Sequence, residues 1–121
     1  MRYEIKVIQE IDSSHQLKLP YESGCNNLHG HRWKVEVVIM SERLNEQDMV
    51  VDFQHVKGII KRYDHIHLND VINPATAEVI AYDLSQEIAE YLAVGEFGNT
   101  HALLTSLTLF ETPSGSVTIW P

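Results

Sequence analysis

Residues 29–40 read HGHRWKVEVVIM, and apolar side chains alternate with polar ones along most of this stretch. The alternation predicts a β-strand with one buried face from Trp33 to Met40. Successive side chains of a strand point to opposite faces of its sheet, so His29 and His31 project from the same face. The segment therefore predicts a strand that carries two neighbouring imidazoles at its beginning.

The same alternation predicts strands near both ends of the chain. One strand is expected over residues 3–7, with a slip of phase at 7–8 that indicates a β-bulge. Two more are expected over residues 103–111 and 117–120. Residues 18–28 contain Pro, Gly and paired Asn residues and are predicted to form a loop.

Two helices are predicted in the middle of the chain. The apolar residues of 53–63 follow helical spacing, and they come after Asp52, a residue type that caps helix N-termini. A second, longer helix is expected to begin at Asn73-Pro74 or at Thr76 and to carry one apolar face. Residues 49–51 are predicted to be a short extended piece.

The order strand, strand, helix, helix, strand, strand predicts an α+β fold with an antiparallel four-stranded sheet and two helices on one face. A length of 121 residues suits one domain, and no linker divides residues 1–121. Such a sheet has open edges, and oligomerisation is one way to cover them.

Composition and charge narrow the class of protein. With 9 basic and 17 acidic residues the formal net charge is −8, so the chain lacks the basic field of a nonspecific nucleic-acid or anionic-membrane binder. No apolar stretch approaches the length of a membrane span. The chain begins directly with a strand pattern, so no signal peptide is expected. Cys25 is the single cysteine, which excludes an intrachain disulfide and predicts a cytoplasmic location.

His29 and His31 have the spacing of two ligands of one zinc ion. Catalytic zinc sites usually have three protein ligands and one open position. His15 is the natural third candidate, because it follows the first predicted strand, which we expect to pair with the second. The alternative is that His29 and His31 are ordinary strand histidines, since the H-x-H pattern is common.

Cys25 lies in a polar loop four residues before His29. Near a zinc ion its thiol would ionise readily and could serve as a base or a nucleophile. Two alternatives stay open: a fourth zinc ligand, which would make the site structural, and an inert loop thiol.

Asp64 and His65 follow the first predicted helix. In a loop, a carboxylate that accepts from one imidazole nitrogen fixes the tautomer and raises the basicity of the other, as proton transfer requires. The alternative is a histidine that interacts with the helix dipole. His55, His67 and His101 have no evident partner in the sequence and are interpreted as surface or packing residues.

Glu111 shares a strand face with Leu107 and Leu109, so its carboxylate must be paired or neutralised. A ligand with two adjacent N–H donors, such as the amino-pyrimidine edge of a pterin or guanine, would pair with it. A mobile glutamate at the rim of the sheet is the alternative. Glu78 opens the second helix, where a negative charge suits the dipole.

Six segments of the chain, taken in order, resemble the 6-pyruvoyltetrahydropterin synthase superfamily, and more closely its 6-carboxytetrahydropterin synthase branch. They are SSHQL at 13–17, CNNLHGH at 25–31, MVVDF at 49–53, DHIHLN at 64–69, PATAE at 74–78 and ET at 111–112. Six segments in register are far more specific than any one of them. The three-residue spacer between Cys25 and His29 resembles the carboxy branch.

The resemblance implies the tunnelling fold, in which subunits pool their sheets into a barrel, and a homohexamer with its sites between subunits. It implies zinc ligands (His15, His29, His31), a proton-transfer group (Cys25, Asp64, His65) and an anchor for the pterin ring (Glu111). The implied reaction converts 7,8-dihydroneopterin triphosphate to 6-carboxytetrahydropterin and releases acetaldehyde and triphosphate. This carbon–carbon lyase step belongs to 7-deazaguanine (queuosine) biosynthesis.

Three alternative functions stay open. The same scaffold performs pyruvoyl chemistry, in which triphosphate is eliminated without carbon–carbon cleavage. A zinc hydrolase would use His65 or Glu111 as the base for a metal-bound water. A non-catalytic zinc- or pterin-binding module would use Cys25 as a fourth ligand.

The chain departs from the family pattern at several positions. Ser13-Ser14 stands where the family usually has Ala-Ala, and Tyr63 replaces a leucine. Gln16 stands where a basic residue is frequent, which leaves Lys18 and Arg32 as the candidate cations for the triphosphate.

Overall fold

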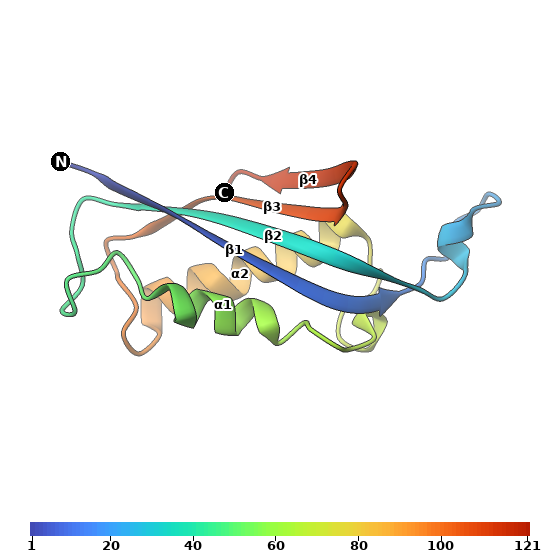
Figure 1. The fold of residues 1–121 in the computed structure, drawn as a ribbon, viewed down its shortest axis with the longest axis horizontal. Helices are drawn as coiled ribbons and strands as arrows, with labels where there is room; N and C mark the ends of the chain where they lie inside the picture. The colour runs from blue at the N-terminus through green and yellow to red at the C-terminus, as the bar shows by residue number, and fades with distance from the viewer.

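The computed structural model describes residues 1–121 and has the predicted order of elements. Four antiparallel strands form one sheet in the order β1-β2-β3-β4: β1 (Tyr3–His15), β2 (His29–Ser41), β3 (Leu103–Thr112) and β4 (Gly115–Ile119). Two helices lie against one face of this sheet (Figure 1): α1 (Phe53–Lys61) and α2 (Ala77–Val94). The α+β prediction is confirmed.

The longest pairing joins β1 to β2 in a continuous register over all 13 residues of each strand. The bulge predicted at Val7-Ile8 is therefore wrong. Ile8 is an apolar residue on the exposed face, and this broke the alternation without interrupting the ladder. β1 also extends to His15, so that residue lies at the end of the strand, directly opposite His29.

Side-chain caps set the beginnings of both helices. The carboxylate of Asp52 accepts the backbone N–H of Gln54 at 2.8 Å, as expected of an N-cap. The hydroxyl of Thr76 accepts the N–H of Val79 at 3.2 Å, so α2 begins after Thr76 rather than at Asn73-Pro74. Residues 49–51 form bends instead of the predicted extended piece.

The core fills the space between the helices and one face of the sheet. Alternate residues of β2 are fully buried there, beginning with Trp33, while their neighbours point away from the helices. Burial of each large apolar side chain contributes about 1.5–3 kcal/mol. Because His29 and His31 share the alternation of Trp33, they also point toward the helix side, at the end of the core.

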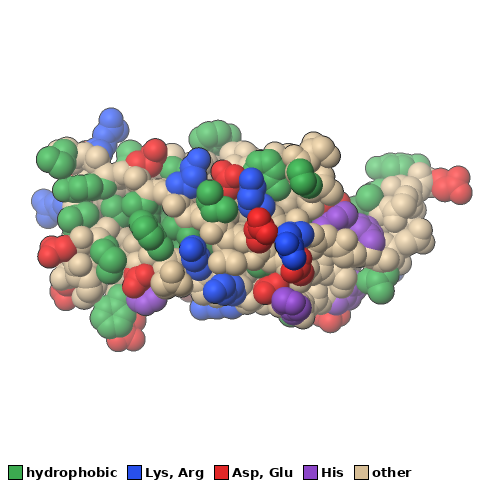
Figure 2. All heavy atoms as spheres, viewed as in Figure 1, with side chains coloured by type: hydrophobic (Ala, Val, Ile, Leu, Met, Phe, Trp, Pro, Cys, Tyr) green, Lys and Arg blue, Asp and Glu red, His purple; other side chains and the backbone are tan.

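The other face of the sheet carries ion pairs beside apolar side chains such as Ile8. Lys34 approaches Glu36 at 3.2 Å and Arg32 approaches Asp12 at 3.1 Å, and Figure 2 shows basic and acidic side chains alternating across the middle of the molecule. Exposed pairs of this kind each contribute little to stability. Neither helix has the length and apolar character needed to cross a membrane.

Candidate functional site

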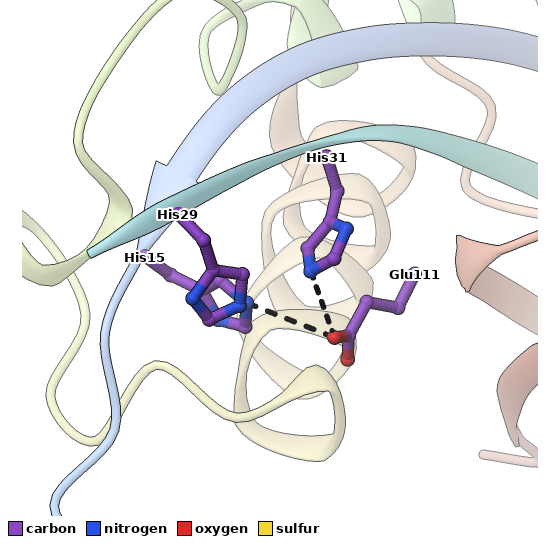
Figure 3. A group of neighbouring side chains, drawn as sticks. All are labelled: His15, His29, His31 and Glu111. Atoms are coloured by element: carbon purple, nitrogen blue, oxygen red, sulfur yellow. Dashed lines mark ion pairs between the residues drawn. The ribbon is translucent and has the colours of Figure 1, made fainter. Parts of the chain in front are cut away.

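The end of the sheet brings three histidines together on the side covered by the helices (Figure 3). His15 lies opposite His29 across the β1–β2 ladder, and His31 follows two residues later on β2. The ring centroids of His15 and His29 are 4.4 Å apart, and those of His29 and His31 are 4.7 Å apart. Strand register alone therefore creates a cluster of three imidazoles.

Glu111 of β3 joins this cluster. Its Oε1 lies 3.0 Å from Nε2 of His31 and 3.8 Å from Nε2 of His15. One donor atom from each of these three residues and from His29 lies within 4.8 Å of all the others. The carboxylate on this apolar strand face thus lies against the imidazoles, without a hydrogen bond to Nε2 of either His15 or His31.

Backbone carbonyl groups orient two of the imidazoles. Nδ1 of His15 bonds to the carbonyl oxygen of Ala75 at 2.8 Å, and Nδ1 of His29 bonds to that of Asn27 at 2.6 Å. A carbonyl oxygen can only accept, so each Nδ1 carries the proton and each Nε2 presents a lone pair. Metal-binding histidines are commonly held in this way.

Two buried nitrogen atoms of the cluster have no hydrogen bond: Nε2 of His15 and Nε2 of His31. Buried polar atoms nearly always have a partner, so the cluster is chemically complete only with a further group. Burial lowers the pKa of His15, only partly opposed by its bond to Ala75, and the neutral ring is the form that binds metals. Three imidazoles and a carboxylate with converging donors are a set that could bind a metal and that fits zinc.

Trp33 forms the floor of the cluster. Its ring is fully buried, and its centroid lies 4.9 Å from that of His15 and 5.4 Å from that of His31. The indole Nε1 donates to the carbonyl oxygen of Ser13 at 3.1 Å. The ring therefore has a fixed orientation and supports two of the imidazoles.

Asp64 and His65 form a pair in the turn after α1. Oδ2 of Asp64 lies 3.0 Å from Nδ1 of His65, and Oδ1 accepts the backbone N–H of Asp12 at 2.7 Å. The N–H of His65 donates to the carbonyl oxygen of Asp12 at 2.7 Å and holds His65 at a φ of 56°. The hydrogen bond from Asp12 and the contact with His65 lower the pKa of Asp64, so the carboxylate stays ionised. It accepts from Nδ1–H of His65 and leaves Nε2 free.

The Asp64–His65 pair and the histidine cluster lie on opposite faces of the sheet. Asp12 contacts the pair, and along β1 its side chain points away from the face that carries His15. A hollow of about 650 Å³ lies beside the pair, lined by Asp12, Ser13, Ser14, Gly30, His31, Arg32, His65, Ile66 and His67. Within one chain, the sheet separates the two groups.

Cys25 lies apart from both groups. It belongs to a short 3-10 helix (Gly24–Asn26) in the segment between β1 and β2, which projects away from the body of the molecule (Figure 1). Its thiol is half-buried and is not among the converging donor atoms. Within one chain the fourth converging donor atom is that of Glu111, and a role of Cys25 as a fourth ligand stays a prediction that these contacts do not support.

Two histidines interpreted as unpartnered have side-chain partners. Nδ1 of His67 lies 3.0 Å from Oγ of Ser14, and Nδ1 of His55 lies 2.7 Å from the hydroxyl of Tyr91. Neither partner could be identified from sequence, because each contact joins segments far apart in the chain.

A sheet covered by two helices, with a histidine cluster at its end, defines an α+β protein with a candidate metal site. The chain belongs to the 6-pyruvoyl tetrahydropterin synthase family, whose sequence model matches residues 4–121. Its four strands and two helices are those of the tunnelling fold expected for that family.

Solved structures agree on the fold. The 6-pyruvoyl tetrahydropterin synthase of Caenorhabditis elegans superposes with a TM-score of 0.75 at 19% identity, over 100% of this chain and 96% of that one. A Plasmodium vivax 6-pyruvoyltetrahydropterin synthase variant superposes with a TM-score of 0.72 at 16% identity, over 98% of this chain and 97% of that one.

Relatives at higher sequence identity carry the name of the 6-carboxytetrahydropterin synthase branch. A 6-carboxy-5,6,7,8-tetrahydropterin synthase of Rickettsia conorii is 30% identical over 87% of this chain and 91% of that protein. The enzyme of that name from Aquifex aeolicus is 36% identical over 65% of this chain and 60% of that protein. A Pyrococcus horikoshii relative is 52% identical over a segment that spans 54% of this chain and 43% of that protein.

Proposed function

We propose that the protein is a zinc-dependent 6-carboxytetrahydropterin synthase. It converts 7,8-dihydroneopterin triphosphate to 6-carboxytetrahydropterin and releases acetaldehyde and triphosphate, a step of queuosine biosynthesis. The observation that carries the proposal is the cluster of His15, His29 and His31, in which two buried Nε2 atoms lack partners. The names of the Rickettsia and Aquifex relatives support the carboxy branch.

His15, His29 and His31 would hold the zinc ion. Bound there, zinc supplies Lewis-acid chemistry that lowers the pKa of the substrate's side-chain hydroxyl groups. Glu111 would anchor the pterin ring, since an ionised carboxylate can accept two parallel N–H donors. Its side chain is 30% exposed, so a ligand can reach it.

Cys25, Asp64 and His65 would transfer the protons. Cys25 as thiolate would remove or return one proton, and His65, oriented by Asp64, would handle the second. Because the Asp64–His65 pair and the cluster face opposite sides of the sheet, the groups of one chain do not meet. A homohexamer with sites between subunits would bring them together and would also cover the outer edges of β1 and β4.

The test is incubation of the zinc-loaded protein with 7,8-dihydroneopterin triphosphate, with products identified by mass spectrometry. Acetaldehyde together with a carboxylated tetrahydropterin supports the proposal. Triphosphate release with a pyruvoyl product would assign the sister activity, which the matched solved structures carry in their names. No turnover by zinc-loaded protein would overturn the assignment as an enzyme of this reaction.

The approach of Glu111 favours one other function. With its carboxylate 3.0 Å from His31 Nε2, Glu111 could fill the fourth coordination position and leave a closed, structural site. The protein would then be a non-catalytic zinc-binding module. The two functions differ in metal exchange, because a closed four-ligand site should bind no pterin and should release zinc slowly to a chelator.

A further inference from the structure

The hollow beside the Asp64–His65 pair is lined by a second histidine of the same segment, His67. His65 and His67 both line it, and Ile66 between them is held against β1, where its carbonyl oxygen accepts the N–H of Ser14 at 3.1 Å. The segment therefore runs beside the strand and presents its two histidines to one cavity of about 650 Å³. A single ligand in that cavity could contact both rings.

The two histidines are held by partners of different chemistry. Asp64 is an ionised acceptor, so it fixes the proton of His65 on Nδ1 and leaves Nε2 as a base. His67 instead contacts Oγ of Ser14 at 3.0 Å, and a hydroxyl both donates and accepts. His67 can therefore keep this hydrogen bond as the imidazolium, in which Nδ1–H donates to the hydroxyl and Nε2–H is the acid.

Gly30 keeps the floor of the hollow open. It has no positive φ, and a Cβ at this position would meet only the carbonyl oxygen of Ser13, at an ordinary distance of 3.8 Å. The fold of the chain itself therefore does not require glycine here. A side chain at residue 30 would instead take up space in the hollow, where a ligand would lie.

Charge argues against the hollow as a phosphate site. Arg32 is the only Lys or Arg that lines it, and Arg32 is already paired with Asp12 at 3.1 Å and with Glu10 at 3.9 Å. The carboxylate of Asp64 adds another negative charge. A triphosphate would be repelled, whereas the uncharged carbon skeleton and hydroxyl groups of a substrate would not.

We propose that His67 is a second proton-transfer residue, a general acid that works in the same hollow in which His65 is the base. The inference rests on the proposed function. Nε2 of His65 takes a proton from a C–H or O–H bond of the substrate, and the electron pair stays on the substrate. Nε2–H of the His67 imidazolium gives a proton to the atom that receives this pair, which leaves His65 as the imidazolium and His67 as the neutral Nδ1–H ring. Both imidazoles then return to their starting states by proton exchange with water.

The first test needs no activity. Two-dimensional ¹H–¹⁵N spectra of the imidazole nitrogens, recorded above neutral pH, report which nitrogen of each neutral histidine carries the proton. We expect the Nδ1–H form for His65, and for neutral His67 an Nδ1–H population that changes in a Ser14→Ala variant, because this is the ring that remains after Nε2 has given up its proton. A pure Nε2–H form of neutral His67 would overturn its role as an acid, because the imidazolium would then lose its proton from Nδ1 and not from Nε2.

The second test is a substitution that removes Nε2 of His67 and keeps a polar group at this position. Asparagine at position 67 keeps a polar group near Ser14 and removes Nε2, so His67→Asn should fold and melt as the unsubstituted protein does. Its kcat should fall about 100-fold with little change in KM, in line with the usual contribution of one acid–base group. His101→Gln, at an exposed histidine outside the hollow, is the matched control.

Deuterium uptake from D₂O separates the two histidines. The His67→Asn variant should still exchange a substrate C–H proton, because His65 is intact, whereas His65→Gln should lose both exchange and turnover. Full turnover by His67→Asn would overturn the inference and leave the proposed function standing. Failure of the unsubstituted protein to turn over would overturn the proposed function, and the tautomer spectra would then still decide the state of His67.

Discussion

Nδ1 of His15 donates a 2.8 Å hydrogen bond to the carbonyl oxygen of Ala75, which lies 60 residues later in the chain. Both residues are fully buried, and Ala75 directly precedes Thr76, the N-cap of α2. The cap therefore fixes the carbonyl group that orients the imidazole. The beginning of the longest helix and the geometry of the candidate metal site depend on one another.

Metal binding should stabilise this end of the fold. Zinc at 100 times its dissociation constant would raise the free energy of unfolding by about 2.7 kcal/mol, because the unfolded chain lacks the preformed site. We expect a chelator to lower the melting temperature by about 10 °C. Differential scanning calorimetry with and without the chelator, combined with metal analysis, measures this effect.

His31→Ala should abolish both the bound zinc and the sensitivity to chelator. His101→Ala, which changes an exposed histidine outside the cluster, should retain both. Full zinc stoichiometry in His31→Ala would contradict the assignment of this ligand.

A substitution at Glu111 should distinguish a role in binding the pterin from a role in binding the metal. If the carboxylate anchors the pterin ring, Glu111→Gln keeps one zinc per chain and raises KM by about 10-fold or more, because one bidentate pair is lost. If the carboxylate is a fourth ligand, the same variant binds zinc more weakly and exchanges it faster. Metal-competition titrations and steady-state kinetics on one preparation distinguish these results.

Tyr63 should contribute to stability in a pH-dependent way. Its hydroxyl donates to Oδ2 of Asp83 at 2.7 Å and so links the turn after α1 to α2. Tyr63→Phe should lower the free energy of unfolding by about 1–2 kcal/mol at neutral pH. Urea unfolding measures the loss, with the exposed Tyr21→Phe as the control.

Burial, with a further contribution from the Asp83 carboxylate, raises the pKa of Tyr63 above the ordinary value of 10.0. Above that pH the unfolded chain loses the phenolic proton while the folded chain keeps it. The free energy of unfolding should therefore fall as pH rises beyond about 10. The slope should be smaller in Tyr63→Phe, and equal slopes in the two proteins would count against this origin.

The sequence predicted the features that depend on the local periodicity of apolar residues. It missed the features that depend on contacts between segments far apart in the chain. Alternation along β2 placed His29 and His31 on one face, but only the strand register shows that His15 lies directly opposite His29. The contact of Ser14 with His67 joins residues 53 positions apart, and no local pattern marks it. Ile8 led to the wrong prediction of a bulge, because an exposed apolar residue interrupts the alternation of the sequence without interrupting the strand.

Gly30 offers a test of the hollow that leaves the metal ligands unchanged. A Cβ at residue 30 would meet the Ser13 carbonyl oxygen only at 3.8 Å. The free energy of unfolding of Gly30→Ala should therefore lie within about 1 kcal/mol of that of the unsubstituted protein, and the variant should keep its zinc. Its KM should rise, because the methyl group enters the space of the ligand. Gly24→Ala, where a Cβ meets nothing within 4 Å, is the matched control, and an unchanged KM in Gly30→Ala would exclude the hollow from substrate binding.

Mixing two inactive variants should restore activity if the site is shared between subunits. Cys25→Ala and His65→Gln each remove one proposed proton-transfer group, and each should be inactive alone. After equal amounts are unfolded, mixed and refolded together, a site that takes Cys25 from one chain and His65 from another is intact in about one case in four, and activity should recover to about that fraction. His15→Ala mixed with His29→Ala should recover nothing, since both side chains belong to the cluster of a single chain. Recovery in neither mixture, with each protein folded and oligomeric, would mean that one chain supplies both Cys25 and His65, and the projecting segment that carries Cys25 would then have to fold back toward its own Asp64–His65 pair.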